Sequence, residues 1–266
     1  MNKKKQLLSA FLIAVATATN FAIQPPKVIA HRGIWTEPGS TQNSIRSLVK
    51  ADSIGCYATE FDVWMTADSV MVVSHDGTVE GVNFTINPAE KVTALRLSNG
   101  EHTPTLEAML DTAATLKIRL IVEVKDHQNR DRDYEAARQT VKLVNAKGLT
   151  DRVEYISYSK DATDELVRIS GRPIYYLRGD YTPEELKEKG CTGADYQFRK
   201  LMEDTTFTAR CHDLGLKVNV WTPVNTDEIN FCIDNGVDFI TTDNPRLAER
   251  LIRQKHPNAE TYIKID

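Results

Sequence analysis

The sequence predicts an α/β fold, a (β/α)₈ TIM barrel with a small β-rich insertion after the second strand. Apolar runs and amphipathic runs alternate about eight times along 266 residues, which is the count and length typical of such a barrel. Polar residues also lie at or just past the C-terminal ends of several different strands. A barrel gathers those ends in one mouth, whereas a doubly wound open sheet, the alternative, spreads them along an edge.

The first elements follow from hydrophobic spacing. Residues 28–31 predict a strand, and residues 44–54 predict a helix whose apolar stripe includes Ile45 and Leu48. Residues 57–63 predict the second strand.

A hairpin follows the second strand. Only residues 66–69 separate it from the apolar run 70–73, which is too short for a parallel crossover, so the pairing is antiparallel. The turn brings His75 back opposite position 60, 61 or 62. A slip of one residue would turn the imidazole to the other face, and the register stays open.

β-prone and turn residues continue beyond the hairpin, and we expect an insertion at about residues 67–104. Thr105 then predicts the N-cap of the next helix. From there strands and helices alternate regularly. The further predicted strands are 120–124, 153–158, 173–177, 194–198, 218–221 and 239–242. The further predicted helices lie near 133–147, 161–169, 183–189, 204–214, 226–235 and 245–254.

The N-terminus has the pattern of a secretory signal peptide. Three lysines at positions 3–5 precede the uncharged apolar run 7–18, which ends in the small-x-small sequence Ala16-Thr17-Ala18. The run is shorter than the roughly 20 residues of a membrane span, so we expect cleavage and no stable membrane insertion. We therefore expect a signal peptide at 1–18, a linker to about 24, one barrel domain at 25–266, and a periplasmic or secreted protein.

Net charge argues against polyanionic partners. Removing residues 1–18 with their three lysines lowers the formal charge from −4 to −7, which disfavours nucleic-acid and anionic-membrane surfaces and leaves a small-molecule substrate. Export permits disulfides, and we leave open whether the four cysteines are buried thiols or include one bridge. They are Cys56, Cys191, Cys211 and Cys232.

Three carboxylates predict a metal site. Glu60 and Asp62 lie two residues apart on the second strand and so face the same side, as do Glu123 and Lys125 on a later strand. Alone, the second pair is more often a strand-end ion pair of little energetic worth. Three converging carboxylates, however, repel one another unless a cation joins them. All-oxygen ligands favour Mg²⁺ or Ca²⁺ over Zn²⁺.

His31-Arg32-Gly33 follows the first strand directly. A lone histidine at a strand end is most often structural, but the adjoining glycine lets a ligand approach the backbone closely. The guanidinium of Arg32 matches phosphate oxygens. Together with His75 and a metal, these residues predict phosphoryl-transfer chemistry with a general base and a general acid.

Several short motifs follow one another in order along residues 28–251. They are His31-Arg32-Gly33, Asn43 with Ala51, Glu60-Phe61-Asp62-Val63, Thr66-x-Asp68, Val72-Val73-Ser74-His75-Asp76, Glu123-Val124-Lys125, Val220-Trp221-Thr222 and Thr242-Asp243-Asn244-Pro245. This series resembles the glycerophosphodiester phosphodiesterase family. The resemblance implies a barrel, a divalent ion held by Glu60, Asp62 and Glu123, and His31 and His75 as the acid–base pair.

The resemblance further implies hydrolysis of glycerophosphodiesters to glycerol 3-phosphate and an alcohol. Arg32 and Lys125 would bind the phosphate, and Trp221 is either barrel core or a wall for the substrate. The family usually has an acid where this chain has Gln42, which leaves the exact substrate open. A sphingomyelinase D-like phospholipase and a non-catalytic phosphodiester-binding protein are the alternatives.

The signal-peptide interpretation makes a direct prediction about the mature protein. Mass analysis of the protein recovered from its host should find an N-terminus near Thr19, because cleavage follows the small-x-small sequence. A full-length N-terminus in the cytosol would contradict it.

Overall fold

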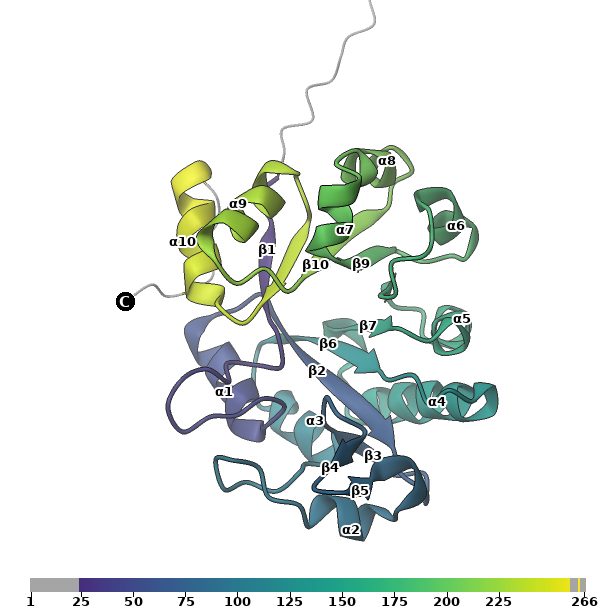
Figure 1. Cartoon of the computed structure of the whole chain (residues 1–266). Helices are drawn as coiled ribbons and strands as arrows, with labels where there is room; N and C mark the ends of the chain where they lie inside the picture. The colour runs from purple at the N-terminus through teal and green to yellow at the C-terminus, as the bar shows by residue number, and fades with distance from the viewer. Residues whose placement is uncertain (1–23, 259–262, 264–266) are drawn as a thin grey trace, which may run out of the picture.

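The computed structural model describes residues 24–258 and 263. The predicted barrel is confirmed: parallel strands pair in the order β1-β11-β10-β9-β8-β7-β6-β2, and β1 pairs with β2 to close the ring (Figure 1). The signal peptide predicted for residues 1–18 lies outside the described residues. No helix within the described part of the chain is both long enough and apolar enough to cross a bilayer.

The barrel strands agree closely with the predicted ones. They are β1 Lys27–Ala30, β2 Ala58–Met65, β6 Arg119–Val124, β7 Val153–Ser157, β8 Ile174–Tyr176, β9 Gly193–Gln197, β10 Lys217–Trp221 and β11 Phe239–Thr242. The surrounding helices are α1 Ile45–Ile54, α3 Leu106–Ala114, α4 Arg130–Ala146, α5 Lys160–Ile169, α6 Pro183–Glu188, α7 Phe198–Glu203, α8 Phe207–Asp213, α9 Thr226–Asp234 and α10 Pro245–Lys255.

Side-chain alternation on the strands divides the interior into two regions. Outward residues such as Phe61 and Val63 belong to the large core that also includes buried helix residues. Inward residues such as Ile29, Ile121 and Phe239 fill the barrel itself. Because polar residues follow these apolar ones toward the strand ends, apolar side chains fill the lower barrel and polar groups gather at its mouth.

Local capping explains where the first helices begin. Ser44 forms a capping box with Ser47 at the start of α1, and Gly55 ends that helix in the left-handed conformation. Thr105 caps α3 as predicted, its hydroxyl accepting a hydrogen bond from the Ala108 N–H.

The helix predicted at 204–214 corresponds to α8, which begins three residues later, and the sequence did not predict the short helix α7 before it. The chain turns at Asp204, whose carboxylate accepts hydrogen bonds from the backbone N–H and hydroxyl of Thr206. These bonds compete with helix continuation, so α7 ends at Glu203 and α8 begins at Phe207. Phe198, predicted as the last residue of a strand, instead begins α7.

The insertion contains strands and also a helix that the sequence did not predict. It comprises β3 Met71–Val73, β4 Thr78–Val79, β5 Val82–Asn83, the 3₁₀ turn η1 Phe84–Ile86 and α2 Ala89–Thr93. In Figure 1 these elements lie together beside the C-terminal end of β2. Val72, Phe84 and Val92 form a small core of their own. All four cysteines are buried free thiols, which settles the disulfide question for this structure.

Gly33 allows a stability prediction. It has φ +77°, and a Cβ there would lie 2.7 Å from the backbone carbonyl carbon of Ser47. Gly148 has φ +68° with nothing within 4 Å of such a Cβ. Chemical denaturation of Gly148→Ala should therefore show only the left-handed strain, about 1–2 kcal/mol. Gly33→Ala should lose about 1–3 kcal/mol more through overpacking. Equal losses would show that the contact with Ser47 is unimportant.

Candidate active site

Strand register brings the three predicted carboxylates together. Asp62 on β2 pairs directly with Glu123 on β6, and Glu60 lies two residues before Asp62 on the same inward face. All three are buried, with exposed fractions of 2, 1 and 7% for Glu60, Asp62 and Glu123. One oxygen from each lies within 4.8 Å of the others, so the group could hold a metal ion.

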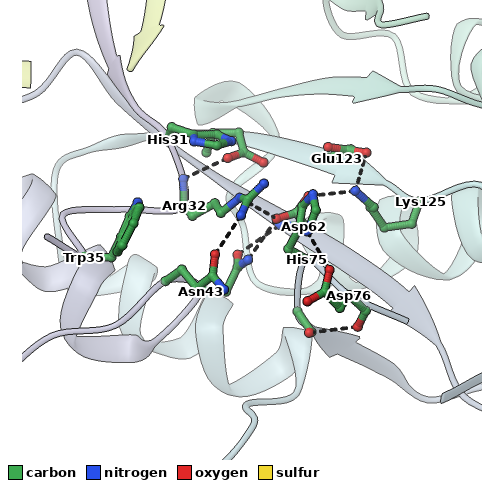
Figure 2. Close-up of polar contacts among 12 residues, drawn as sticks. His31, Arg32, Trp35, Asn43, Asp62, His75, Asp76, Glu123 and Lys125 are labelled. Atoms are coloured by element: carbon green, nitrogen blue, oxygen red, sulfur yellow. Dashed lines mark hydrogen bonds and ion pairs between the residues drawn. The ribbon is translucent and has the colours of Figure 1, made fainter. Parts of the chain in front are cut away.

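Lys125 is the cation nearest this group, and it neutralises only part of the charge. Its Nζ lies 3.1 Å from Asp62 Oδ1 and 2.9 Å from Glu123 Oε1 (Figure 2). Burial raises the pKa of Asp62, but Lys125 and hydrogen bonds outweigh burial and lower that pKa to about 2. Burial and the charge of Asp62 raise the pKa of Glu123 to about 8.

Glu60 shows most clearly that a cation fits here. Burial, followed by the charges of Asp62 and Glu123, raises the pKa of Glu60 well above its ordinary value. Its Oε2 accepts a hydrogen bond from the Arg32 N–H, but its buried Oε1 has no hydrogen-bond partner in the part of the chain that the structure describes. An unpaired buried carboxylate oxygen beside two other carboxylates matches the oxygen ligands that Mg²⁺ and Ca²⁺ prefer.

His31 is held by residues from the far end of the sequence. Its Nδ1 lies 2.7 Å from Oδ1 of Asp243, just after β11, and the Trp35 indole N–H donates to the same oxygen at 3.0 Å. Burial raises the pKa of Asp243, but these hydrogen bonds and the charge of His31 outweigh it and lower the pKa. The carboxylate therefore fixes the orientation of the imidazole through Nδ1.

Arg32 is positioned by the loop that connects β1 to α1. Its Nη1 donates to Gln42 Oε1 at 2.7 Å, and its Nε lies 3.9 Å from Asp62 Oδ2. Asn43 makes two hydrogen bonds to Asp62, donating to Oδ2 at 2.8 Å and accepting from the backbone N–H at 3.2 Å. Gln42 thus orients the guanidinium without cancelling its charge.

His75 reaches the site because the hairpin ends early. Val73 pairs with Val63, so a continued strand would place His75 opposite Phe61, on the outer face. The strand ends at Val73, and a last backbone hydrogen bond joins the Ser74 N–H to the Asp62 carbonyl oxygen at 3.0 Å. His75 instead lines the cavity, with its Nδ1 2.8 Å from Asp76 Oδ1. Burial lowers the pKa of His75; Lys125 and Arg32 lower it further, against the opposing charge of Asp62.

These groups surround one cavity of about 100 Å³ at the barrel mouth. Of the eight predicted site residues, seven line the cavity. The eighth, Asp62, contacts two of those seven, Arg32 and Lys125. The lining residues named so far are His31, Arg32, Glu60, His75, Glu123, Lys125 and Trp221. Trp221 therefore forms a wall of the cavity rather than buried core.

Three residues with clear positions were given no role by the sequence. Asp243 and Asp76 each hold a histidine, and both belong to motifs already noted, Thr242-Asp243 and His75-Asp76. Asp195 also lines the cavity, although nothing in its sequence context, Gly193-Ala194-Asp195, distinguishes it from a surface acid.

Fold and site together define a class: a (β/α)₈-barrel hydrolase with a buried acidic group, two carboxylate-bound histidines and two cations suited to a phosphate ester. Residues 31–247 match the glycerophosphoryl diester phosphodiesterase family, and the chain belongs to that family. It is a phosphodiesterase, as the resemblance predicted.

Relatives extend along nearly the whole chain. A glycerophosphodiester phosphodiesterase of Caldanaerobacter subterraneus is 24% identical over 244 residues, which are 85% of this chain and 98% of the relative. The crystal structure of one from Parabacteroides distasonis is 44% identical with a TM-score of 0.86, covering 87% of this chain and 98% of that one. A phosphodiesterase of Oleispira antarctica, solved with the product sn-glycerol-3-phosphate, is 19% identical with a TM-score of 0.76, covering 85% and 96%.

The acidic group predicts a pH-dependent effect of metal on stability. A carboxyl group whose pKa is raised in the folded state stabilises the fold fully when the pH is below its ordinary, unfolded-state pKa. This stabilisation is lost as the pH rises through the raised, folded-state pKa. For Glu123 this window runs from 4.5 to about 8. Calorimetry should therefore show that Mg²⁺ or Ca²⁺ raises Tm more at about pH 8 than at about pH 5, where protons compete with the metal.

Glu60→Gln is the matched variant, because it removes one charge and keeps the side-chain shape. Without metal at about pH 8 it should unfold some 2–4 °C above the unsubstituted protein, corresponding to about 1 kcal/mol of relieved repulsion. Its metal-induced rise in Tm should be smaller. An identical rise in both proteins would exclude Glu60 from the metal site.

Proposed function

We propose that this protein is an exported, metal-dependent hydrolase that cleaves glycerophosphodiesters, such as glycerophosphocholine and glycerophosphoethanolamine, to sn-glycerol 3-phosphate and an alcohol. The observation that carries the proposal is a pair of histidines, each bound through Nδ1 to a carboxylate, lining the same small cavity as the acidic group. Export rests on the N-terminal sequence pattern. Family membership supports the reaction class.

Glu60, Asp62 and Glu123 would hold the divalent ion, Mg²⁺ or Ca²⁺. When bound, such an ion supplies Lewis-acid stabilisation of phosphate oxygens. Their burial keeps water away and strengthens every charge interaction in the cavity.

Arg32 and Lys125 would bind the phosphate oxygens. Both line the cavity, and the two carboxylates beside Lys125 raise its pKa despite burial, so the ammonium stays charged. Cations placed in advance at the phosphate stabilise the charge that develops in the transition state without reorganisation.

His31 and His75 would share the proton transfers. One imidazole takes a proton from the nucleophile, which is water or the neighbouring glycerol hydroxyl, and the other gives a proton to the leaving alcohol. Asp243 and Asp76 each occupy one ring nitrogen, which sets the tautomer and directs the second nitrogen toward the substrate.

The acid–base proposal predicts the behaviour of two variants. His31→Ala and His75→Ala should each lower kcat on glycerophosphocholine by at least about 100-fold while metal binding persists. His212→Ala is the matched control, because His212 pairs with Asp238 at the surface, away from the cavity; its kcat should be unchanged. A p-nitrophenyl diester of glycerol 3-phosphate needs no proton on its leaving group, so it should rescue only the variant that lacks the general acid.

Product analysis separates the alternatives. Purified protein with metal that binds these diesters but hydrolyses none of them would be a phosphodiester-binding protein, since binding alone requires no matched acid and base. Hydrolysis of sphingomyelin but of no glycerophosphodiester would favour the sphingomyelinase D-like activity. Release of sn-glycerol 3-phosphate, measured by coupled oxidation, is the expected result.

A further inference from the structure

Asp195 is a buried carboxyl group of the catalytic cavity that neither the metal site nor the acid–base pair uses. It lies in the middle of β9 and is 1% exposed. Its neighbours Ala194 and Tyr196 point outward into the core, so Asp195 points into the barrel, where it lines the same cavity as His31 and Glu123. Its buried Oδ1 has no hydrogen-bond partner among the described residues.

Two neighbouring polar side chains, Asn219 and Trp221, leave Asp195 Oδ1 without a hydrogen bond among the described residues. Asn219, the residue opposite on β10, hydrogen-bonds to the Asp195 carboxyl, but its amide is also engaged with the Thr241 hydroxyl at 2.9 and 3.2 Å. The Trp221 indole N–H donates to the backbone oxygen of Asp195 at 3.0 Å, not to its carboxyl group. Buried polar atoms without partners are rare, so Oδ1 is available to a ligand.

The protonation state of Asp195 indicates which chemical class of ligand it would bind. Burial raises the pKa of Asp195 to about 8, and a hydrogen bond from Asn219 lowers it only in part. A carboxyl that keeps its proton at neutral pH both donates and accepts a hydrogen bond. The chemical match is therefore a hydroxyl group, which also donates and accepts a hydrogen bond.

The size of the cavity indicates which part of the substrate would lie beside Asp195. A cavity of about 100 Å³ suits a three-carbon polyol better than a complete diester. Ile156, Leu177 and Trp221 provide apolar walls beside Asp195. Apolar walls with a few placed polar groups are typical of small-molecule pockets, and Asp195 is the polar group beside these apolar walls.

We propose that Asp195 binds a hydroxyl group of the substrate's glycerol and so selects glycerophosphodiesters over phosphodiesters whose esterified alcohol has no further hydroxyl. This inference rests on the proposed function, since it names the recognition element of the same site. The head group, which varies between substrates, then lies outside this end of the cavity.

Binding measurements test the proposal independently of turnover. Calorimetry with Mg²⁺ present would compare sn-glycerol 3-phosphate with propyl phosphate, which has the same carbon chain and no hydroxyls. The unsubstituted protein should prefer sn-glycerol 3-phosphate, and Asp195→Ala should weaken its binding about 10- to 100-fold while leaving propyl phosphate unaffected. Asp195→Asn has an amide that also donates and accepts hydrogen bonds, so it should retain part of the preference for sn-glycerol 3-phosphate. Because its shape is almost unchanged, it also tests the proposal if Asp195→Ala does not fold.

Three results would overturn the assignment. One is an unsubstituted protein that binds both ligands equally, and another is an equal loss for both ligands in Asp195→Ala, which marks a structural role. The third is a fall in kcat/KM confined to choline and ethanolamine diesters, which places Asp195 at the head group. A protein that shows the binding preference yet hydrolyses no diester would refute the proposed function and leave this inference standing.

Discussion

Repulsion among three buried carboxylates is the constraint on which the rest of the site depends. Asp62 and Glu123 are brought together by strand pairing, and one lysine cannot neutralise them together with Glu60. The repulsion explains why hydrogen-bond donors surround the group. The Arg32 backbone N–H, the Arg32 guanidinium and the Asn43 amide all approach carboxylate oxygens. The closed ring of strands holds these charges in place, so a cation would enter a site formed in advance rather than one that it must assemble.

Much of this arrangement is encoded locally. Alternation along a strand places residues two apart on one face, so Glu60 with Asp62 and Glu123 with Lys125 could be paired from the sequence. The regular succession of strands and helices then predicts a closed parallel sheet, whose strand ends must converge. Those two rules suffice for the acidic group and Lys125, because every member lies on or immediately beside a barrel strand.

Other features depend on contacts that no local pattern encodes. Asp243 reaches His31 across 212 positions, and only barrel closure between β1 and β11 makes them neighbours. Asp195 lies between Ala194 and Tyr196, a context that suits an exposed strand as well as a barrel interior. The division between α7 and α8 depends on how the Asp204 side chain is used. In each case the outcome depends on tertiary contacts or on the hydrogen bonds of one side chain, and the spacing of residues in the sequence does not predict it.

The two histidines are attached to different parts of the fold. His31 is tied to the closing seam of the barrel through Asp243. His75 belongs to the insertion, whose small core packs against Trp64 of β2, and the Trp64 indole N–H donates to the backbone oxygen of His75. A Cβ at Gly77 would lie 2.9 Å from that indole, so the insertion rests closely on it. Loosening the insertion would therefore displace His75 and leave the acidic group and His31 in place, so the insertion determines the position of one of the two histidines at the cavity.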